Sequence, residues 1–181
     1  MRVATSVLGC IALAAALLGP LHDAAERSLA AHMVQHMLLI GVAAPLLSLS
    51  LPVLTFPPAA AFLLHGGAIW LAHAPAVIAW MAASHATHML AHVALFGTGL
   101  LFWWALLRRS GEAALWVLAT MIHTGILGVL LTFAPRALYI GYSLADQQLA
   151  GLVMWVPGGF IYLAAGLAFA RRWMASHAVR T

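Results

Sequence analysis

The chain is filled almost end to end by apolar runs that are long enough to cross a lipid bilayer. Of its 181 residues, 65% are hydrophobic and only 7% are charged, whereas a soluble domain carries about 25% charged residues. A membrane-crossing helix needs about 20 mostly apolar residues. The sequence therefore predicts an all-α integral membrane bundle of about six transmembrane helices, formed as a single domain over residues 1–181 and surrounded by lipid.

Proline and charged residues mark the junctions between these runs, where helices are expected to end. The predicted spans are residues 3–19, 32–51, 59–80, 85–107, 112–133 and 147–170. Arg2 ahead of the first run also fits a signal peptide, but no clear small-x-small cleavage site follows. An uncleaved first helix is the preferred interpretation.

The arginines orient the bundle, because cytoplasmic loops of membrane proteins carry the excess of positive charge. With the N-terminus in the cytoplasm, only Arg27 and Arg136 lie outside. The inner side then holds Arg2, Arg108, Arg109, Arg171, Arg172 and Arg180. Both termini are predicted to be cytoplasmic in a bacterial inner membrane, with Trp103 and Trp104 in an inner interfacial belt. Scattered topological charge of this kind argues against a nucleic-acid partner.

Ten histidines are the anomaly of the composition, because histidine is costly in lipid unless it has a partner or a purpose. His32 and His36 share one face of the second span. His88 and His92 do the same in the fourth span, and His73 lies near the outer end of the third. At about 1.5 Å per residue these side chains reach similar depths below the outer boundary. Met154 in the sixth span is expected at that depth too.

The residue types at this level favour a soft metal ion. Neutral imidazole is the commonest metal ligand, and thioether sulfur suits Cu(I). Met33 and Met37 accompany the histidines of the second span. With Cys10 as the single cysteine, neither a Cys-x-x-Cys site nor an intramolecular disulfide can form. Copper fits best, and zinc held by three histidines stays open.

The other histidines have simpler interpretations. His65 and His123 are expected to hydrogen-bond with neighbouring helices, and His22 and His177 to be solvated in a loop and a tail. No hydrolase motif and no glycine-rich phosphate loop occurs. The sequence therefore predicts a binding protein and not an enzyme.

Several stretches have the pattern of a known family. They are DQQLAGLVMWVPGG at 146–159, LGVLLTFAPR at 127–136 with Leu138-Tyr139 after it, APLL at 44–47, LLFWW at 100–104 and the 32–37 segment. Over roughly residues 30–165 the chain resembles the CtaG family of cytochrome c oxidase assembly factors. One departure is Ala91, because family members often carry glutamate just before the last histidine of the fourth span. Many relatives also have seven spans instead of six.

The resemblance implies an integral membrane factor that helps to mature the copper centres of a haem–copper oxidase. The implied metal ligands are His32, His36, His73, His88, His92, Met33 and Met37. Met154 is added to this predicted set because of its depth. The implied cofactor is copper, as Cu(I). The implied partners are membrane lipid, cytochrome c oxidase subunits, a soluble copper chaperone and a second copy of the chain.

Two other functions remain open from the sequence. A haem-binding electron-transfer protein would use paired histidines from facing helices as axial ligands, with His65 and His123 as a second level. A copper permease would place ligands at several depths along a path. An optical spectrum separates haem from Cu(I), and uptake into proteoliposomes tests transport.

Overall fold

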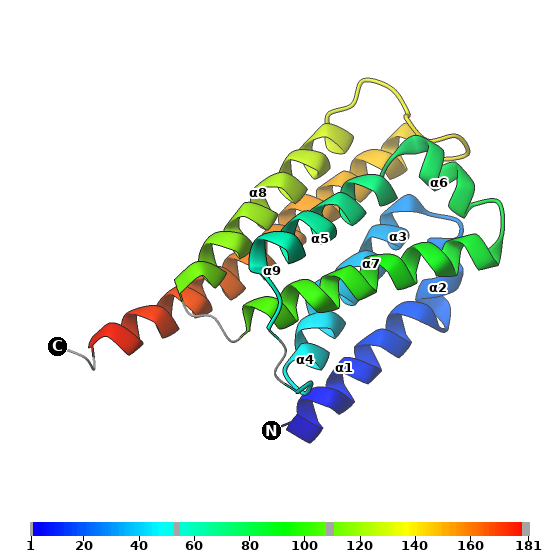
Figure 1. The fold of residues 1–181 in the computed structure, drawn as a ribbon. Helices are drawn as coiled ribbons and strands as arrows, with labels where there is room; N and C mark the ends of the chain where they lie inside the picture. The colour runs from blue at the N-terminus through cyan, green and yellow to red at the C-terminus, as the bar shows by residue number, and fades with distance from the viewer. Residues whose placement is uncertain (1, 53–54, 108–110, 179–181) are drawn as a thin grey trace.

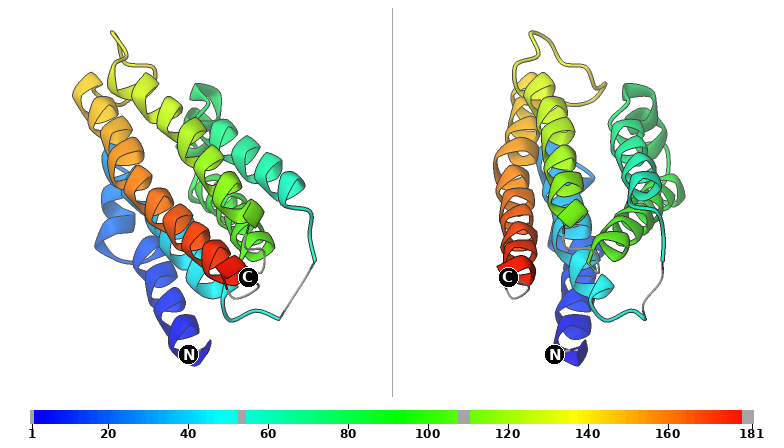
Figure 2. Two further views of the ribbon diagram at one scale, coloured as in Figure 1. Left: turned by 90° about the vertical axis from the view of Figure 1, so that its left-hand side faces the viewer. Right: turned by 60° about the vertical axis from the view of Figure 1, so that its left-hand side comes forward.

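The computed structural model describes residues 2–52, 55–107 and 111–178, and every regular element in these ranges is helical. The helices are α1 (Arg2–Leu17), α2 (Pro20–Ala25), α3 (Leu29–His36), η1 (Met37–Ala43), α4 (Ala44–Ser48), α5 (Pro58–Ala72), α6 (Pro75–Met81), α7 (His85–Leu106), α8 (Gly111–Thr132) and α9 (Leu144–Ala178). The predicted all-α class is confirmed. Figures 1 and 2 show a bundle in which α1 begins and α9 ends at one end, while α2, α6 and the 133–143 connection lie toward the other. We call the latter the site end.

Four helices are long and apolar enough to cross a membrane. They are Leu29–Ser48, His85–Leu106, Glu112–Thr132 and Leu144–Ser176, and α5 with α6 forms a fifth, broken candidate. The predicted first span is the shorter apolar helix Arg2–Leu17, which has 16 residues and spans about 24 Å. The helices are those of a multi-pass membrane protein, and the predicted count of about six is approximate. Arg108, Arg109 and Arg180, used for the orientation, lie outside the described residues.

The predicted third span is not one continuous helix. α5 and α6 meet at an angle of 74°, and His73 and Ala74 form the break between them. Pro75 begins α6, and proline disfavours helical geometry in the residue before it. Ala74 is accordingly extended, with φ −66° and ψ 133°. The break places His73 at a corner of the backbone instead of within a helix.

The second span changes its helical form directly after His36. Residues Met37–Ala43 form a π-helix, a rare form that often occurs at functional sites. In the π pattern the carbonyl of Ile40 would accept from residue 45, but Pro45 has no N–H to donate. The carbonyl of Ile40 instead accepts a 2.6 Å hydrogen bond from Trp103 Nε1.

Small residues bring α8 and α9 into close contact. A Cβ added to Gly128 would lie 2.8 Å from the Trp155 Cβ, and one added to Gly151 would lie 2.5 Å from the Gly128 carbonyl oxygen. Glycine is therefore required on both helices, as in small-residue crossings of membrane helices. α9 also packs along α3, so this crossing fixes one wall of the bundle.

The end of the bundle opposite the site is filled by aromatic side chains. Phe102, Trp103, Leu106, Val117, Tyr162 and Phe169 form one buried cluster. Trp103 is 2% exposed and stacks on Tyr162 with ring centroids 5.9 Å apart. The prediction that Trp103 belongs to an interfacial belt is therefore wrong, because its ring points into the bundle and its N–H bonds to Ile40. Trp104 donates to the carbonyl of Pro52, which lies in the connection between α4 and α5.

Candidate metal centre

Two helices that begin at the site end supply most of the candidate site. Ser28 caps α3 by accepting from Ala31 N at 3.2 Å, and Ser84 caps α7 by accepting from Thr87 N at 3.2 Å. Each helix then presents two histidines one turn apart, His32 and His36 on α3 and His88 and His92 on α7. Such i, i+4 pairs share one helix face, so the two faces meet as four imidazole rings.

The rings interleave closely. The centroid of His32 lies 4.4 Å from that of His36, 5.2 Å from His88 and 5.0 Å from His92. The His92 ring is also 5.1 Å from the His36 ring. His73, at the α5–α6 break, adds a fifth ring 5.4 Å from His36. We call this group the histidine cluster, and it consists of His32, His36, His73, His88 and His92, all of them buried.

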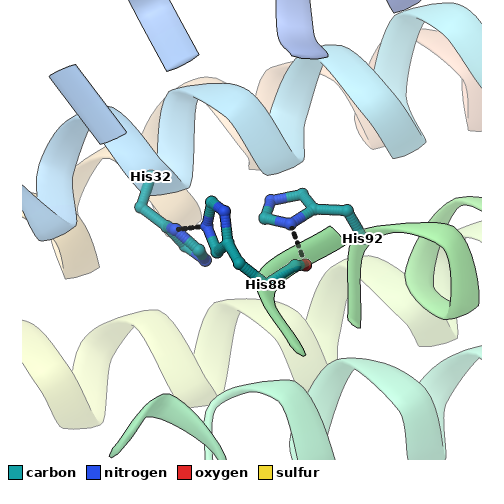
Figure 3. Close-up of side chains that lie close together, drawn as sticks. All are labelled: His32, His88 and His92. Atoms are coloured by element: carbon teal, nitrogen blue, oxygen red, sulfur yellow. Dashed lines mark hydrogen bonds between the residues drawn. The ribbon is translucent and has the colours of Figure 1, made fainter. Parts of the chain in front are cut away.

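Three members of the cluster have the spacing of a metal site. One ring nitrogen from each of His32, His88 and His92 lies within 4.8 Å of the others. Figure 3 shows the three rings turned toward one another, His32 from α3 and the other two from α7. Nitrogens bound to one ion at about 2.0 Å lie about 3.3 Å apart in tetrahedral geometry, so the three rings would move slightly closer on binding. The buried histidines can therefore hold a metal ion.

Several ring nitrogens in the cluster are buried without a hydrogen-bond partner. They are His32 Nε2, His36 Nδ1, His88 Nδ1 and His92 Nε2. Leaving one buried polar atom unsatisfied costs about 1–3 kcal/mol, and native proteins seldom leave such atoms unsatisfied without a reason. The remaining nitrogens of His32 and His88 pair with each other, with Nδ1 and Nε2 3.3 Å apart. Four unpartnered nitrogens on rings of one cluster indicate that the cluster receives a ligand.

The His92 ring is held in the orientation that a metal ligand requires. Its Nδ1 lies 2.9 Å from the carbonyl oxygen of His88 and donates to it, as Figure 3 shows. The proton of the neutral ring is then on Nδ1, and the lone pair is on the unsatisfied Nε2. Metal-bound histidines commonly donate their other N–H to a carbonyl in this way.

His73 and Met33 form the softest part of the cluster. His73 Nδ1 donates to the Ile69 carbonyl at 2.6 Å, and its Nε2 lies 3.1 Å from Met33 Sδ. A neutral ring with its proton on Nδ1 has none to give at Nε2, and a thioether has none at all. The two lone pairs face each other and could both bind one soft cation. Ligand nitrogen and sulfur on one tetrahedral ion would lie about 3.5 Å apart, given bond lengths of about 2.0 and 2.3 Å.

A tyrosine hydrogen-bonds the backbone at the α5–α6 break, where His73 lies. Tyr139, in the 133–143 connection, donates from its hydroxyl to the His73 carbonyl at 2.9 Å. Its side chain is 4% exposed, and burial raises the pKa of Tyr139 to about 12. The phenol therefore stays protonated, and able to donate, at any physiological pH.

Met37 and Met154 are buried but make no described contact with a histidine ring. The Met37 sulfur lies 2.9 Å from where a Cβ on Gly158 would stand, so its thioether packs against α9. Met154 belongs to the same hydrophobic cluster as Met33 and Met37. Both stay predicted ligands, while the structure brings Met33 directly to an imidazole.

Three polar residues that support the site were not predicted. Asp146 begins α9 but accepts from Ser28 Oγ at 2.8 Å and Leu29 N at 2.6 Å, so it caps α3 from another helix. Gln35 is fully buried and donates to the Ala16 carbonyl at 2.7 Å. Glu26 brings a carboxylate near the site end, while Ala91 packs against the apolar core. Asp146 lies in the recognised 146–159 block, which is the signal that could have found it.

His65 and His123 form a second histidine pair, separate from the cluster. His65 is fully buried, and its Nδ1 lies 3.3 Å from Thr98 Oγ1. His123 Nδ1 accepts a 3.3 Å hydrogen bond from Trp70 Nε1. The interpretation of both as hydrogen-bonding partners between helices agrees with these contacts, which use Nδ1 of each ring and leave Nε2 of each without a partner.

The fold and the site together define a class, a multi-pass helical membrane protein with a buried group of histidines able to hold a metal ion. The family model Caa3_CtaG, described as cytochrome c oxidase caa3 assembly factor, matches residues 1–57 and 53–176. The chain belongs to this family, and the predicted resemblance is confirmed. Comparisons with curated proteins and with solved structures give no match.

Proposed function

We propose that the protein binds copper as Cu(I) in the histidine cluster, together with Met33, and passes it to cytochrome c oxidase during assembly. The observation that carries the proposal is the set of four buried ring nitrogens without a partner, next to the His73–Met33 contact. Assembly of the oxidase is the role of the family. The copper, its oxidation state and its transfer are our inference.

The ligand types favour Cu(I) over other ions. The cluster offers imidazole nitrogen and one thioether, and soft or borderline donors of this kind suit Cu(I). Calcium and magnesium require oxygen ligands, and no carboxylate belongs to the cluster among the described residues. A carrier must also release its ion, and a site without thiolates holds Cu(I) less tightly than a cysteine site would.

The proposed partners follow from this role. A soluble copper chaperone would deliver the ion at the site end, and cytochrome c oxidase subunits would accept it within a bacterial inner membrane. The arginine distribution of the sequence orients the site end toward the periplasm. Oxidase subunits, the donor and this orientation are parts of the proposal.

The ring spacing favours a small ion over haem. Centroids within the cluster are 4.4 to 5.4 Å apart, whereas a porphyrin between two axial imidazoles would hold their rings farther apart. A cavity of about 280 Å³ reaches His32 and His88, which is at the lower limit for small-molecule sites. The ligands also gather at one end, above an aromatic core, and this favours a carrier over a permease.

Metal analysis of the purified protein tests the proposal. Wild type is loaded with Cu(I) in detergent under reducing conditions, passed over a desalting column and analysed for copper. We expect stoichiometric copper in wild type and background copper in the triple variant His32→Ala/His36→Ala/His92→Ala. Equal copper in the two proteins would overturn the proposal.

The matched control is the double variant His65→Ala/His123→Ala, which removes one buried and one half-buried imidazole outside the cluster. It should retain wild-type copper. An optical spectrum of the same samples checks the alternative, because a Soret band that shifts on reduction would indicate haem.

A further inference from the structure

A second group of potential ligands lies at the surface beside the histidine cluster. His22 on α2, Glu26 at the end of α2 and His85 at the start of α7 each place one ligand atom within 4.8 Å of the others. We call these three residues the mouth. Glu26 Oε1 lies 3.7 Å from His22 Nε2 and 4.0 Å from His85 Nδ1. The carboxylate thus stands between two imidazoles from different helices.

The mouth is exposed where the cluster is buried. The side chains of Glu26 and His85 are 51% and 68% exposed, and that of His22 is 13% exposed. His22 is also in contact with the interior, because the side-chain N–H of the buried Gln35 donates to its Nδ1 at 3.4 Å. The neutral ring then carries its proton on Nε2, so binding a cation there requires this long hydrogen bond to be given up. The group therefore has one side in solvent and one side against the core.

Two residues of the mouth and two of the cluster line the same cavity. The cavity of about 280 Å³ is bounded by Glu26 and His85 on its outer side and by His32 and His88 on its inner side. The His22 ring lies 5.5 Å from the His85 ring and 5.7 Å from the His88 ring. His88 Nδ1 is one of the nitrogens without a partner. A chain of imidazoles thus runs from solvent to the buried site, with each ring in contact with the next.

The ligand types change along this chain. The mouth combines two imidazoles with a carboxylate, a hard oxygen donor with a negative charge. The cluster combines imidazoles with the Met33 thioether. Since Cu(I) prefers soft donors, its binding becomes tighter from the mouth inward. The carboxylate attracts a cation from solvent, and the softer ligands below draw it onward.

We propose that His22, Glu26 and His85 form a capture site through which Cu(I) reaches the histidine cluster. This inference rests on the proposed function and adds a route and a direction of loading to it. The ion exchanges ligands stepwise, from the mouth to His88 and then to His32 and His92. No electron is transferred, because copper stays Cu(I) throughout.

Loading kinetics test the capture site. Cu(I) is supplied from a weak chromophoric bicinchoninate complex to protein in detergent, and loss of the coloured complex gives both the rate and the final occupancy. The triple variant His22→Ala/Glu26→Gln/His85→Ala should load about 10-fold more slowly than wild type, the lower end of what electrostatic focusing supplies. Its final occupancy should equal that of wild type, since the cluster is intact.

If the triple variant is poorly folded, two single variants that each remove one negative charge test the capture site instead. Glu26→Gln should slow loading, and Asp23→Asn, an exposed acid of α2 that does not line the cavity, should not. Equal rates for wild type and Glu26→Gln would overturn the capture site while leaving the proposed function intact. A lowered final occupancy in the triple variant would also overturn it, because the mouth would then be part of the storage site. A wild type that takes up no copper would overturn the proposed function itself.

Discussion

The histidine cluster and His65 of the second pair are buried, and His123 is half-buried, yet only the cluster has the properties of a metal site. In the second pair, His123 Nδ1 accepts from Trp70 Nε1, so its proton lies on Nε2 and no lone pair is free. His65 Nδ1 faces Thr98 Oγ1, whose own proton is donated to the Leu95 carbonyl. His65 therefore donates from Nδ1 and retains one free lone pair. The pair offers at most one ligand atom.

The cluster differs because its hydrogen bonds direct lone pairs toward one another. His92 and His73 both donate from Nδ1 to a backbone carbonyl four residues earlier. Each ring then turns its Nε2 toward neighbouring ligands. A buried histidine becomes a ligand when its second nitrogen is free and other free donors lie within about 4 Å, and burial alone does not distinguish the two groups.

The largest expected difference appears when one histidine with a free lone pair is removed from each region in turn. His92→Ala should lower Cu(I) affinity more than 100-fold, because loss of a partner that merely supports a ligand already costs 10–100-fold. His65→Ala should change it less than 2-fold, roughly the experimental error. Competition with a chromophoric Cu(I) chelator measures both. Similar losses in the two variants would show that the regions do not differ as described.

A smaller effect is expected from the thioethers. Met33→Leu should lower Cu(I) affinity about 10-fold, corresponding to about 1.4 kcal/mol, and leave Zn(II) affinity nearly unchanged, since zinc gains little from thioether sulfur. Met37→Leu is the matched control, because its sulfur packs against Gly158. Leucine for methionine conserves volume and is well tolerated. If Met37→Leu had the greater effect, the soft ligand would have been assigned to the wrong residue.

The smallest effect should follow from loosening the corner that carries His73. Tyr139→Phe removes the donor to the His73 carbonyl and should cost about 1 kcal/mol of stability. Because burial raises the pKa of Tyr139 to about 12, its contribution is complete below about pH 10 and is lost as pH rises from about 10 to 12. Thermal unfolding in detergent between about pH 10 and 12 should show the wild type losing stability as pH rises. The variant should lose less stability over the same range. Parallel curves would contradict a buried, hydrogen-bonded phenol.

Much of the fold and part of the site could be predicted from the sequence. Apolar runs placed most ends of the long helices within a few residues, because a span needs a nearly uninterrupted apolar stretch. α9 is the exception, because it continues to Ala178 beyond the predicted end at residue 170. The i, i+4 spacing put His32 with His36 and His88 with His92 on common faces, and depth along the helix placed His73 at a similar level. These features depend on local periodicity, which a sequence records directly.

The remaining features depend on contacts between segments far apart in the chain. The cap that Asp146 provides to Leu29 joins residues 117 positions apart, and the sequence suggested only a favourable helix start. The mouth joins Glu26 to His85, and His22 had been assigned to solvent. The break at His73 had a local signal in Pro75, but the long apolar run concealed it. Trp103 was misplaced because an adjacent arginine pair is also typical of an interfacial belt.

X-ray absorption at the copper edge of the Cu(I)-loaded protein tests the central claim most directly. We expect imidazole nitrogens at about 2.0 Å and one sulfur at about 2.3 Å, with the sulfur absent in Met33→Leu and retained in Met37→Leu. A copper ion surrounded by oxygen, or by imidazoles that persist in the His32→Ala/His36→Ala/His92→Ala variant, would contradict a Cu(I) site in the histidine cluster.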